Sequence, residues 1–209
     1  DGTTSRGLGD VYKRQNPDNP NQYRLDGEWR DLEVGEVKLK LKLWGFIPWS
    51  VKREVLRSVH GPALRTEHGV YAVRYAGIDE MKQVEQWLAM NKAKNFEEWR
   101  AAVALNHIQS FNFVYANRHG DIHFIHNAQL PVRAPGWNWQ QYLPGNRSDL
   151  IWQRYHPTSA LPQVTNPASG FVHSANQTPF NITEPEDNPQ PNAVPADGGW
   201  QTRMTNRCL

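Results

Sequence analysis

Three histidines lie within eight residues of the segment "FNFVYANRHGDIHFIHN": His119, His123 and His126. Clustered imidazoles are common ligands of transition metals, so this segment is the first candidate for chemistry. The flanking strand formers and the turn residues "NRHGD" predict a β-hairpin with Gly120 in its turn. Side chains alternate faces along a strand, so His123 and His126 are predicted to point to opposite faces. The pattern therefore favours polar positions on a hairpin over a three-histidine metal site.

Other common catalytic patterns are absent from the sequence. Cys208 is the only cysteine, which excludes an internal disulfide, a thiolate zinc cluster and a C-x-x-C redox pair. No serine lies in a G-x-S-x-G elbow. The chain therefore shows no nucleophile of its own by these patterns.

The composition is that of a globular protein, with 38% hydrophobic residues, 21% charged residues and a net charge of +2 in 209 residues. The segment "KLKLKL" alternates lysine with leucine, which is typical of a strand with one solvated face. No apolar run reaches the roughly 18 residues of a membrane span. We therefore expect neither a nucleic-acid nor a membrane partner.

The first 15 residues, "DGTTSRGLGDVYKRQ", show no periodicity, and their tail resembles a translated sequencing adapter. We interpret residues 1–15 as non-native and exclude them from the fold, which leaves residues 16–209 as one domain. A similar non-native origin is one interpretation of the terminal pair Cys208-Leu209.

The part of the chain that follows is predicted to be β-rich. A turn is expected at Asp26-Gly27, because this pair tolerates positive φ. Clean alternation follows, with one apolar face: Val37, Leu39, Leu41 and Leu43. "FIPWSVKREVLRSV" and "VYAVRYA" predict further strands, with "HGPAL" as a break between them.

Two helices are predicted next. From Asp79, a period near 3.6 suggests a core-packed helix with an apolar set of Met81, Val84, Trp87, Leu88 and Met90. A second helix is expected to begin at Asn95, with Glu98 completing a capping box.

Residues 131–200 are dense in Pro, Gly, Asn and Trp, and only "GFVHSAN" looks like a strand. Because disordered segments are poor in aromatics, we expect an ordered excursion of the kind that carries function. The elements together indicate an α+β fold.

Several segments, in order, resemble the penicillin acylase family of N-terminal nucleophile hydrolases: "LDGEWRDL", "RSVHGPAL", "AKNFEEWRAA", "FNFVYANRHGDIHFIHNAQLPVR" and "VTNPASGFVHSANQTP". The resemblance covers residues 23–207. It departs at Asn117, where the family usually has Asp; this hairpin position bears on local structure more than on chemistry.

The resemblance implies an amidase that acts on linear N-acyl amides through a Ser at the N-terminus of a large (β) chain. That Ser lies upstream of the "DGEW" motif, so we interpret this chain as a fragment without it. Asn176 matches the oxyanion asparagine of the family, whose amide N–H stabilises the developing alkoxide. A turn or cap role is the alternative for Asn176.

Two more residues follow from the resemblance. Arg203, in "TRMTN", matches an active-site arginine, with Arg207 as a competitor. Asp187 fits the spacing of a structural calcium ligand, beside Glu184 and Glu186, although such an acidic loop can also be only solvated.

The family fold implies a four-layer αββα sandwich, of which this chain would be an incomplete part with antiparallel strands, a helical pair and a long Pro/Trp-rich loop. The implied partners are a small (α) chain, the missing N-terminal part of the large chain and an N-acyl substrate. The implied location is periplasmic or secreted.

A non-catalytic β-rich module is the alternative interpretation. Trp137, Trp139 and Trp152 in a loop-rich region could stack on carbohydrate rings if they are exposed. Such a module would not explain the ordered series of motifs.

Overall fold

The computed structural model describes residues 8–78, 80–175 and 177–196. Its contacts divide the chain into two compact units, each of which is treated by itself. The β unit contains Leu8–Tyr75 and Ala134–Trp152. The helical unit contains the described residues of 76–133 and 153–196.

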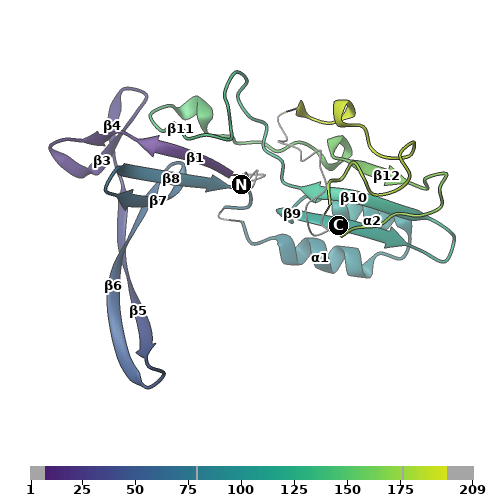
Figure 1. Ribbon diagram of the computed structural model, residues 1–209, viewed down its shortest axis with the longest axis horizontal. Coiled ribbons are helices and arrows are strands. Elements are labelled where there is room, and N and C mark those ends of the chain that lie inside the picture. The colour runs from purple at the N-terminus through teal and green to yellow at the C-terminus, as the bar shows by residue number, and fades with distance from the viewer. Residues whose placement is uncertain (1–7, 79, 176, 197–209) are drawn as a thin grey trace. The chain divides into compact units, whose positions relative to one another are not determined.

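The β unit has a six-stranded sheet in the order β11-β1-β8-β7-β6-β5 (Figure 1). Its strands are β1 (Leu8–Lys13), β5 (Glu33–Leu43), β6 (Ile47–Ser58), β7 (Gly61–Thr66), β8 (Gly69–Tyr75) and β11 (Leu143–Pro144). A smaller sheet contains β2 (Gln15–Asn16), β3 (Asn19–Leu25) and β4 (Glu28–Asp31). All pairings are antiparallel except β1 with β11. The segment "HGPAL", expected as a break, provides most of β7.

The exclusion of residues 1–15 from the fold needs correction. Residues 8–13 form β1, which pairs along its whole length with β8, and Val11 is buried in the core of the β unit. The Lys13 ammonium lies 2.8 Å from the carbonyl oxygen of Gly145 and 2.5 Å from His60 Nδ1. Burial lowers the pKa of Lys13 to about 7. That residues 1–15 are non-native remains a prediction.

The turn predicted at Asp26-Gly27 is confirmed. Asp26 and Gly27 have φ values of 49° and 90°, and they join β3 to β4. Two successive positive φ values are the signature of the tight turn whose twist matches antiparallel strands. Asp26 Oδ1 also accepts a hydrogen bond from the Ser148 N–H at 3.0 Å, which ties the turn to the later loop.

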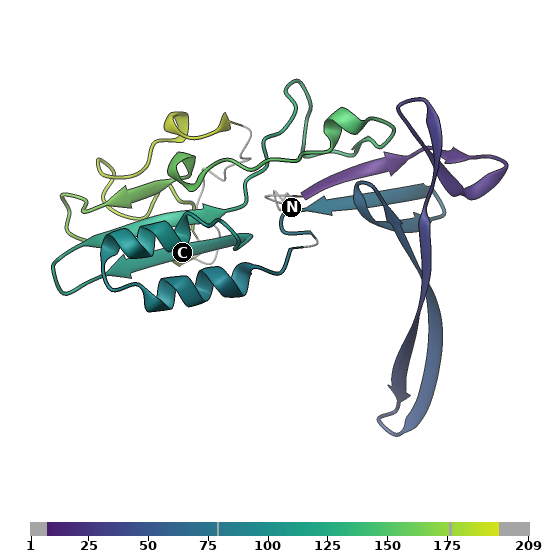
Figure 2. The ribbon, with the colours of Figure 1, turned by 180° about the vertical axis from the view of Figure 1, so that it is seen from behind.

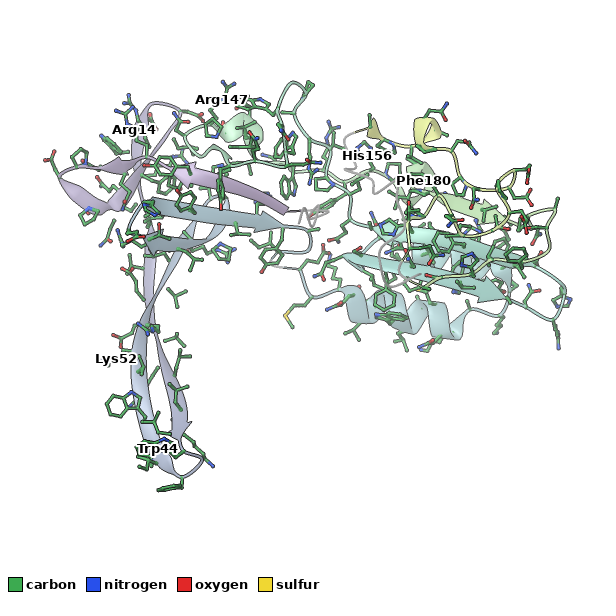
Figure 3. All side chains as sticks on the ribbon, viewed as in Figure 1. Arg14, Trp44, Lys52, Arg147, His156 and Phe180 are labelled. Atoms are coloured by element: carbon green, nitrogen blue, oxygen red, sulfur yellow. The ribbon has the colours of Figure 1, made fainter. Side chains whose placement is uncertain are left out.

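Strands β5 and β6 form a long two-stranded arm with Trp44 at its tip and Lys52 along its length (Figure 3). One face of the arm is apolar, because Leu39 pairs with Val51, Leu41 with Trp49 and Leu43 with Ile47. The lysines of "KLKLKL" occupy the other face, as predicted. All of β5 is solvent-exposed in this chain, so its apolar face is uncovered as well.

The helical unit contains α1 (Gln83–Lys92), α2 (Phe96–Val103) and a three-stranded sheet in the order β12-β10-β9. The strands are β9 (Ser110–Ala116), β10 (Ile122–Ala128) and β12 (Gln163–Thr165). The two helices lie along one face of β9 and β10 (Figure 2). Their shared core contains Met90, Trp99, Ala102, Val103, Ile108, Phe113 and Ile125.

The two helices differ in how well the sequence predicted them. Asn95 caps α2 as expected, because its side chain accepts the Glu98 N–H at 2.8 Å. Helix α1 begins at Gln83, later than expected, and Asp79 lies outside the described residues. Its predicted core face is only partly confirmed, because Met90 is buried in the shared core. Val84 and Leu88 are 70% and 52% exposed, whereas Gln86 is buried.

Residues 134–175 and 177–196 have little regular structure apart from β11, β12 and three short 3₁₀ helices, η1 (Ser148–Leu150), η2 (Thr158–Ala160) and η3 (Pro191–Ala193). The strand expected in "GFVHSAN" is wrong, since residues 171–174 belong to no strand. The α+β class is confirmed. Among the described residues, no helix is long and apolar enough to cross a membrane.

Candidate active-site loop

The predicted hairpin is confirmed as β9 and β10, with Gly120 at φ 93° in its turn. Asn117 organises this turn, since its Oδ1 accepts the N–H groups of His119 and Asp121 at 2.8 and 3.0 Å. This local role is the one expected for the position. His119 is exposed in the turn.

His123 lies on the helix face of β10. Its ring centroid is 5.3 Å from that of Phe96 and 5.7 Å from that of Trp99. Its Nδ1 lies 2.7 Å from Thr165 Oγ1. Burial, and secondarily the positive charge of Arg100, lower the pKa of His123 to about 4, so the ring is neutral at pH 7. His123 is therefore a core histidine, not an exposed polar position.

His126 lies on the opposite face, as the strand period predicts. Its Nδ1 is 2.6 Å from Asn112 Oδ1, and Asn112 Nδ2 donates to Ser174 Oγ at 3.2 Å. Because the Asn112 oxygen can only accept, His126 carries a proton on Nδ1. This chain of three side chains connects the hairpin to the segment just before position 176.

The loop that follows is held by its own polar groups. Thr183 Oγ1 lies 2.6 Å from Ser169 Oγ and donates to the Phe171 carbonyl at 2.8 Å. The side-chain oxygen of Asn188 accepts the N–H groups of Ile182 and Thr183 at 2.8 and 3.2 Å. These bonds replace the hydrogen bonds that a strand would have supplied, so residues 169–175 and 177–188 have a fixed path without forming a strand.

Gln177 holds the centre of this loop. Its side chain is 4% exposed, and its Oε1 accepts the Ala175 N–H. Its Nε2 donates to the carbonyl oxygens of His173 and Asn181 at 3.2 and 3.1 Å. The amide group thus joins the chain before position 176 to the chain after it.

Asn176 and Arg203, the two predicted catalytic residues, both lie outside the described residues, as does Arg207. Ala175 and Gln177, which flank Asn176 in the sequence, are described and belong to the bonded loop. The catalytic assignments therefore remain predictions.

Asp187 is half-buried, and its Oδ2 accepts the Ser169 N–H at 2.8 Å. That backbone hydrogen bond is the main reason that the pKa of Asp187 is lowered, so the carboxylate is ionised at neutral pH. No group of three His, Cys, Asp or Glu that could hold a metal occurs in residues 8–78, 80–175 and 177–196. Calcium takes six to eight oxygen ligands, so the described side chains alone do not complete a site at Asp187.

A hollow of about 460 Å³ lies on the helix face of the sheet in the same unit. Its lining includes Glu97, Arg100 and His123 from α2 and β10, and Ser159 from the excursion. His126 and Asn112 point to the other face, so the hollow is not part of the loop that carries Gln177.

The tryptophans that suggested a carbohydrate module pack inward in the β unit. Trp152 is 4% exposed, and its ring centroid lies 5.9 Å from that of Trp139. Trp137 and Trp139 are half-buried against the core of the β unit. The exposed stacking platforms that the alternative requires are not formed by these three residues.

The sequence model of the penicillin amidase family matches residues 6–206. The chain belongs to this family. Penicillin G acylase of Escherichia coli is 28% identical over 178 residues, which are 81% of this chain and 20% of that protein. Acyl-homoserine lactone acylase PvdQ of Pseudomonas fluorescens (strain Pf0-1) is 29% identical over 101 residues, 44% of this chain and 13% of that protein.

A thermostable penicillin G acylase from Alcaligenes faecalis has a similar fold, with a TM-score of 0.65 and 22% identity. The similarity covers 88% of this chain and 33% of that one. The matched part of this chain therefore corresponds to about a fifth of the length of the Escherichia coli protein and a third of the length of the Alcaligenes faecalis chain.

The resemblance to this family pointed to Asn176 but not to the described residues that hold the chain before and after position 176. Gln177, Asn112 and Ser174 were missed, because their spacing does not show that Gln177 bonds to the loop backbone or that Asn112 donates to Ser174. The one usable signal was a polar residue, Asn112, at an inner position of an otherwise apolar strand.

Proposed function

We propose that this chain is part of a longer N-acyl amide hydrolase of the penicillin amidase family, and that it provides the oxyanion half of the active site. The observation that carries the proposal is the bonded loop around position 176. Gln177 bridges the backbone on both sides of this position, and a catalytic donor must be held in this way if it is to be preorganised.

In this proposal the Asn176 amide donates a hydrogen bond to the carbonyl oxygen of the substrate as it becomes an alkoxide. Loss of one such donor typically costs about 3 kcal/mol of transition-state stabilisation. The nucleophile is an N-terminal Ser hydroxyl outside residues 1–209, and its own α-amino group, with a pKa near 8, accepts the proton. Arg203 lies beside the reacting amide.

The same proposal covers the context of the site. The longer protein has a four-layer αββα sandwich, a small (α) chain as partner and a periplasmic or secreted location. Asp187 provides one carboxylate to a structural calcium ion, which would supply rigidity and no chemical step. The acyl group belongs to a β-lactam, an acyl-homoserine lactone or another N-acyl compound.

The experiment compares the 209-residue chain with the longer polypeptide of the same gene on a chromogenic N-acyl amide. We expect turnover by the longer polypeptide only, because the nucleophile lies outside residues 1–209. Turnover by the pure 209-residue chain, abolished by replacing one of its own serines, would contradict the proposal. Absence of turnover by a folded, processed longer polypeptide on a panel of N-acyl amides would also contradict it.

A further inference from the structure

Strand β9 forms one edge of the sheet in the helical unit, and the adjacent helix leaves an apolar surface uncovered. In the order β12-β10-β9, β9 is last, so no described strand pairs with its outer side. Trp87 of α1 and Phe111 of β9 contact each other, with ring centroids 5.7 Å apart. Phe111 is 54% exposed, and on α1 Leu88 is 52% and Val84 70% exposed.

The direction of the free backbone groups follows from the pairing of β10. The Ile122 carbonyl and the His126 N–H bond toward the β12 side, to Asn166 and Pro162. Residues alternate direction along an antiparallel strand, so the intervening residues of β10 bond to β9. Their partners in β9 are Phe111, Phe113 and Tyr115. The N–H and C=O groups of Asn112, Val114 and Ala116 therefore point to the open edge.

This edge lacks the features by which proteins protect a solvent-exposed edge. Such strands usually carry Lys, Pro or a bulge, or are very short. "SFNFVYA" has no charged residue and no proline, and its register with β10 is unbroken over seven pairs. By contrast β12, at the other edge, has three residues. In the β unit, edge strand β5 carries Lys38, Lys40 and Lys42.

We propose that β9 pairs with a further β-strand from the part of the acylase outside residues 1–209, and that apolar side chains next to that strand cover the surface formed by Val84, Trp87, Leu88 and Phe111. The relatives supply the length that this requires, since residues matched here make up 20% of the Escherichia coli protein. The inference rests on the proposal that the chain is part of such a longer enzyme.

Hydrogen exchange resolved to single amides tests the inference in two proteins, the 209-residue chain and the longer polypeptide. The amides of Asn112, Val114 and Ala116 should exchange quickly in the chain and at least 100-fold more slowly in the longer polypeptide. The amides of Phe113 and Tyr115, which point to β10, serve as internal controls and should be protected in both. Equally fast exchange of the three outward amides in the longer polypeptide would overturn the inference.

A second copy of the chain is the competing occupant. Protection of the outward amides in the 209-residue chain that increases with protein concentration, together with a dimer in light scattering, would overturn our assignment in its favour. The exchange result is independent of catalysis. An inactive longer polypeptide with protected outward amides would contradict the proposed function and leave this inference standing.

Val114→Pro provides a matched variant, with Val114→Thr as its control. Proline removes only the outward N–H at this position and is tolerated at a strand edge. The melting temperature of the 209-residue chain should change by less than about 4 °C in both variants. In the longer polypeptide, Val114→Pro should lower the melting temperature by more than Val114→Thr does. Equal melting temperatures of these two variants of the longer polypeptide would count against pairing at β9.

Discussion

The Gln177 side chain accepts the Ala175 N–H and donates to the Asn181 carbonyl, so one buried amide fixes the backbone on both sides of position 176. An oxyanion donor gains its effect from being held in place before the reaction. In the proposed function, this relationship is the reason to expect that the Asn176 amide is held in place before the reaction.

Gln177→Ala should therefore lower kcat of the longer polypeptide by about 10-fold, with a smaller change in KM, because positioning of the donor matters most in the transition state. The same change should destabilise the chain by about 1–3 kcal/mol, since the loop carbonyl groups lose their partner. Steady-state kinetics and urea unfolding measure the two effects.

Gln190→Ala is the control for Gln177, because Gln190 is exposed in the same unit. Its kcat should stay within about twofold of the wild type. A Gln177→Ala enzyme that loses stability but keeps its kcat would show that Gln177 holds the fold and does not position the donor.

His123 should make the chain sensitive to acid. Its pKa is lowered from 6.5 to about 4, so the folded state disfavours the protonated ring. As the pH falls from 6.5 toward 4, the unfolded chain binds a proton that the folded chain does not, and stability is lost. The loss is on the order of 3 kcal/mol.

Urea unfolding at pH 7 and pH 4.5 measures this loss, with His123→Gln for comparison. Arg100, whose charge contributes to the lowered pKa, and Glu97, which lines the same hollow as His123, both remain in the variant. His60, whose pKa is lowered to about 3, also contributes but cancels in the difference. Equal acid sensitivity of the two proteins would refute the assignment to His123.

Asp187 should mediate a response to calcium. If it is a ligand, millimolar calcium should raise the melting temperature of the longer polypeptide, as linkage requires. Asp187→Asn keeps an oxygen that can accept the Ser169 N–H and removes the charge. The variant should therefore melt near the wild-type temperature without calcium and lose the response to it.

Glu186→Gln, at the exposed position next to Asp187, controls for a general effect of charge and should keep the calcium response. The calcium assignment fails if the wild type shows no calcium shift, or if Asp187→Asn shows the same shift. His123→Ala and His126→Ala should not alter the metal content.

Local signals in the sequence predicted the local structure well. Asp26-Gly27 and Asn95 act through their own backbone neighbours, so the turn and the cap could be read directly. The β10 alternation separated His123 from His126 for the same reason. The buried face of helix α1 could not be predicted in this way. Its apolar stripe indicates which face should be buried, but it does not show whether residues of this chain pack against that face.

The loop shows the other limit. "GFVHSAN" has the composition of a strand, but the loop that contains it is held by side-chain hydrogen bonds. Thr183 bonds to Ser169, 14 residues earlier, and Asn188 accepts the Thr183 N–H. Burial of Lys13 likewise depends on Gly145, far along the chain. Contacts of this kind arise only when distant segments meet, and no local pattern encodes them.

The central claim is that Asn176 is the oxyanion donor, and kcat of Asn176→Ala in the longer polypeptide tests it most directly. Asn192→Ala, at an exposed position of η3, is the control, and mass spectrometry must first show that each variant is processed. We predict that kcat of Asn176→Ala falls by about 10²- to 10³-fold with a much smaller change in KM, whereas Asn192→Ala stays near the wild type. A correctly processed Asn176→Ala enzyme with near-normal kcat would contradict the account and leave Asn176 as a turn residue.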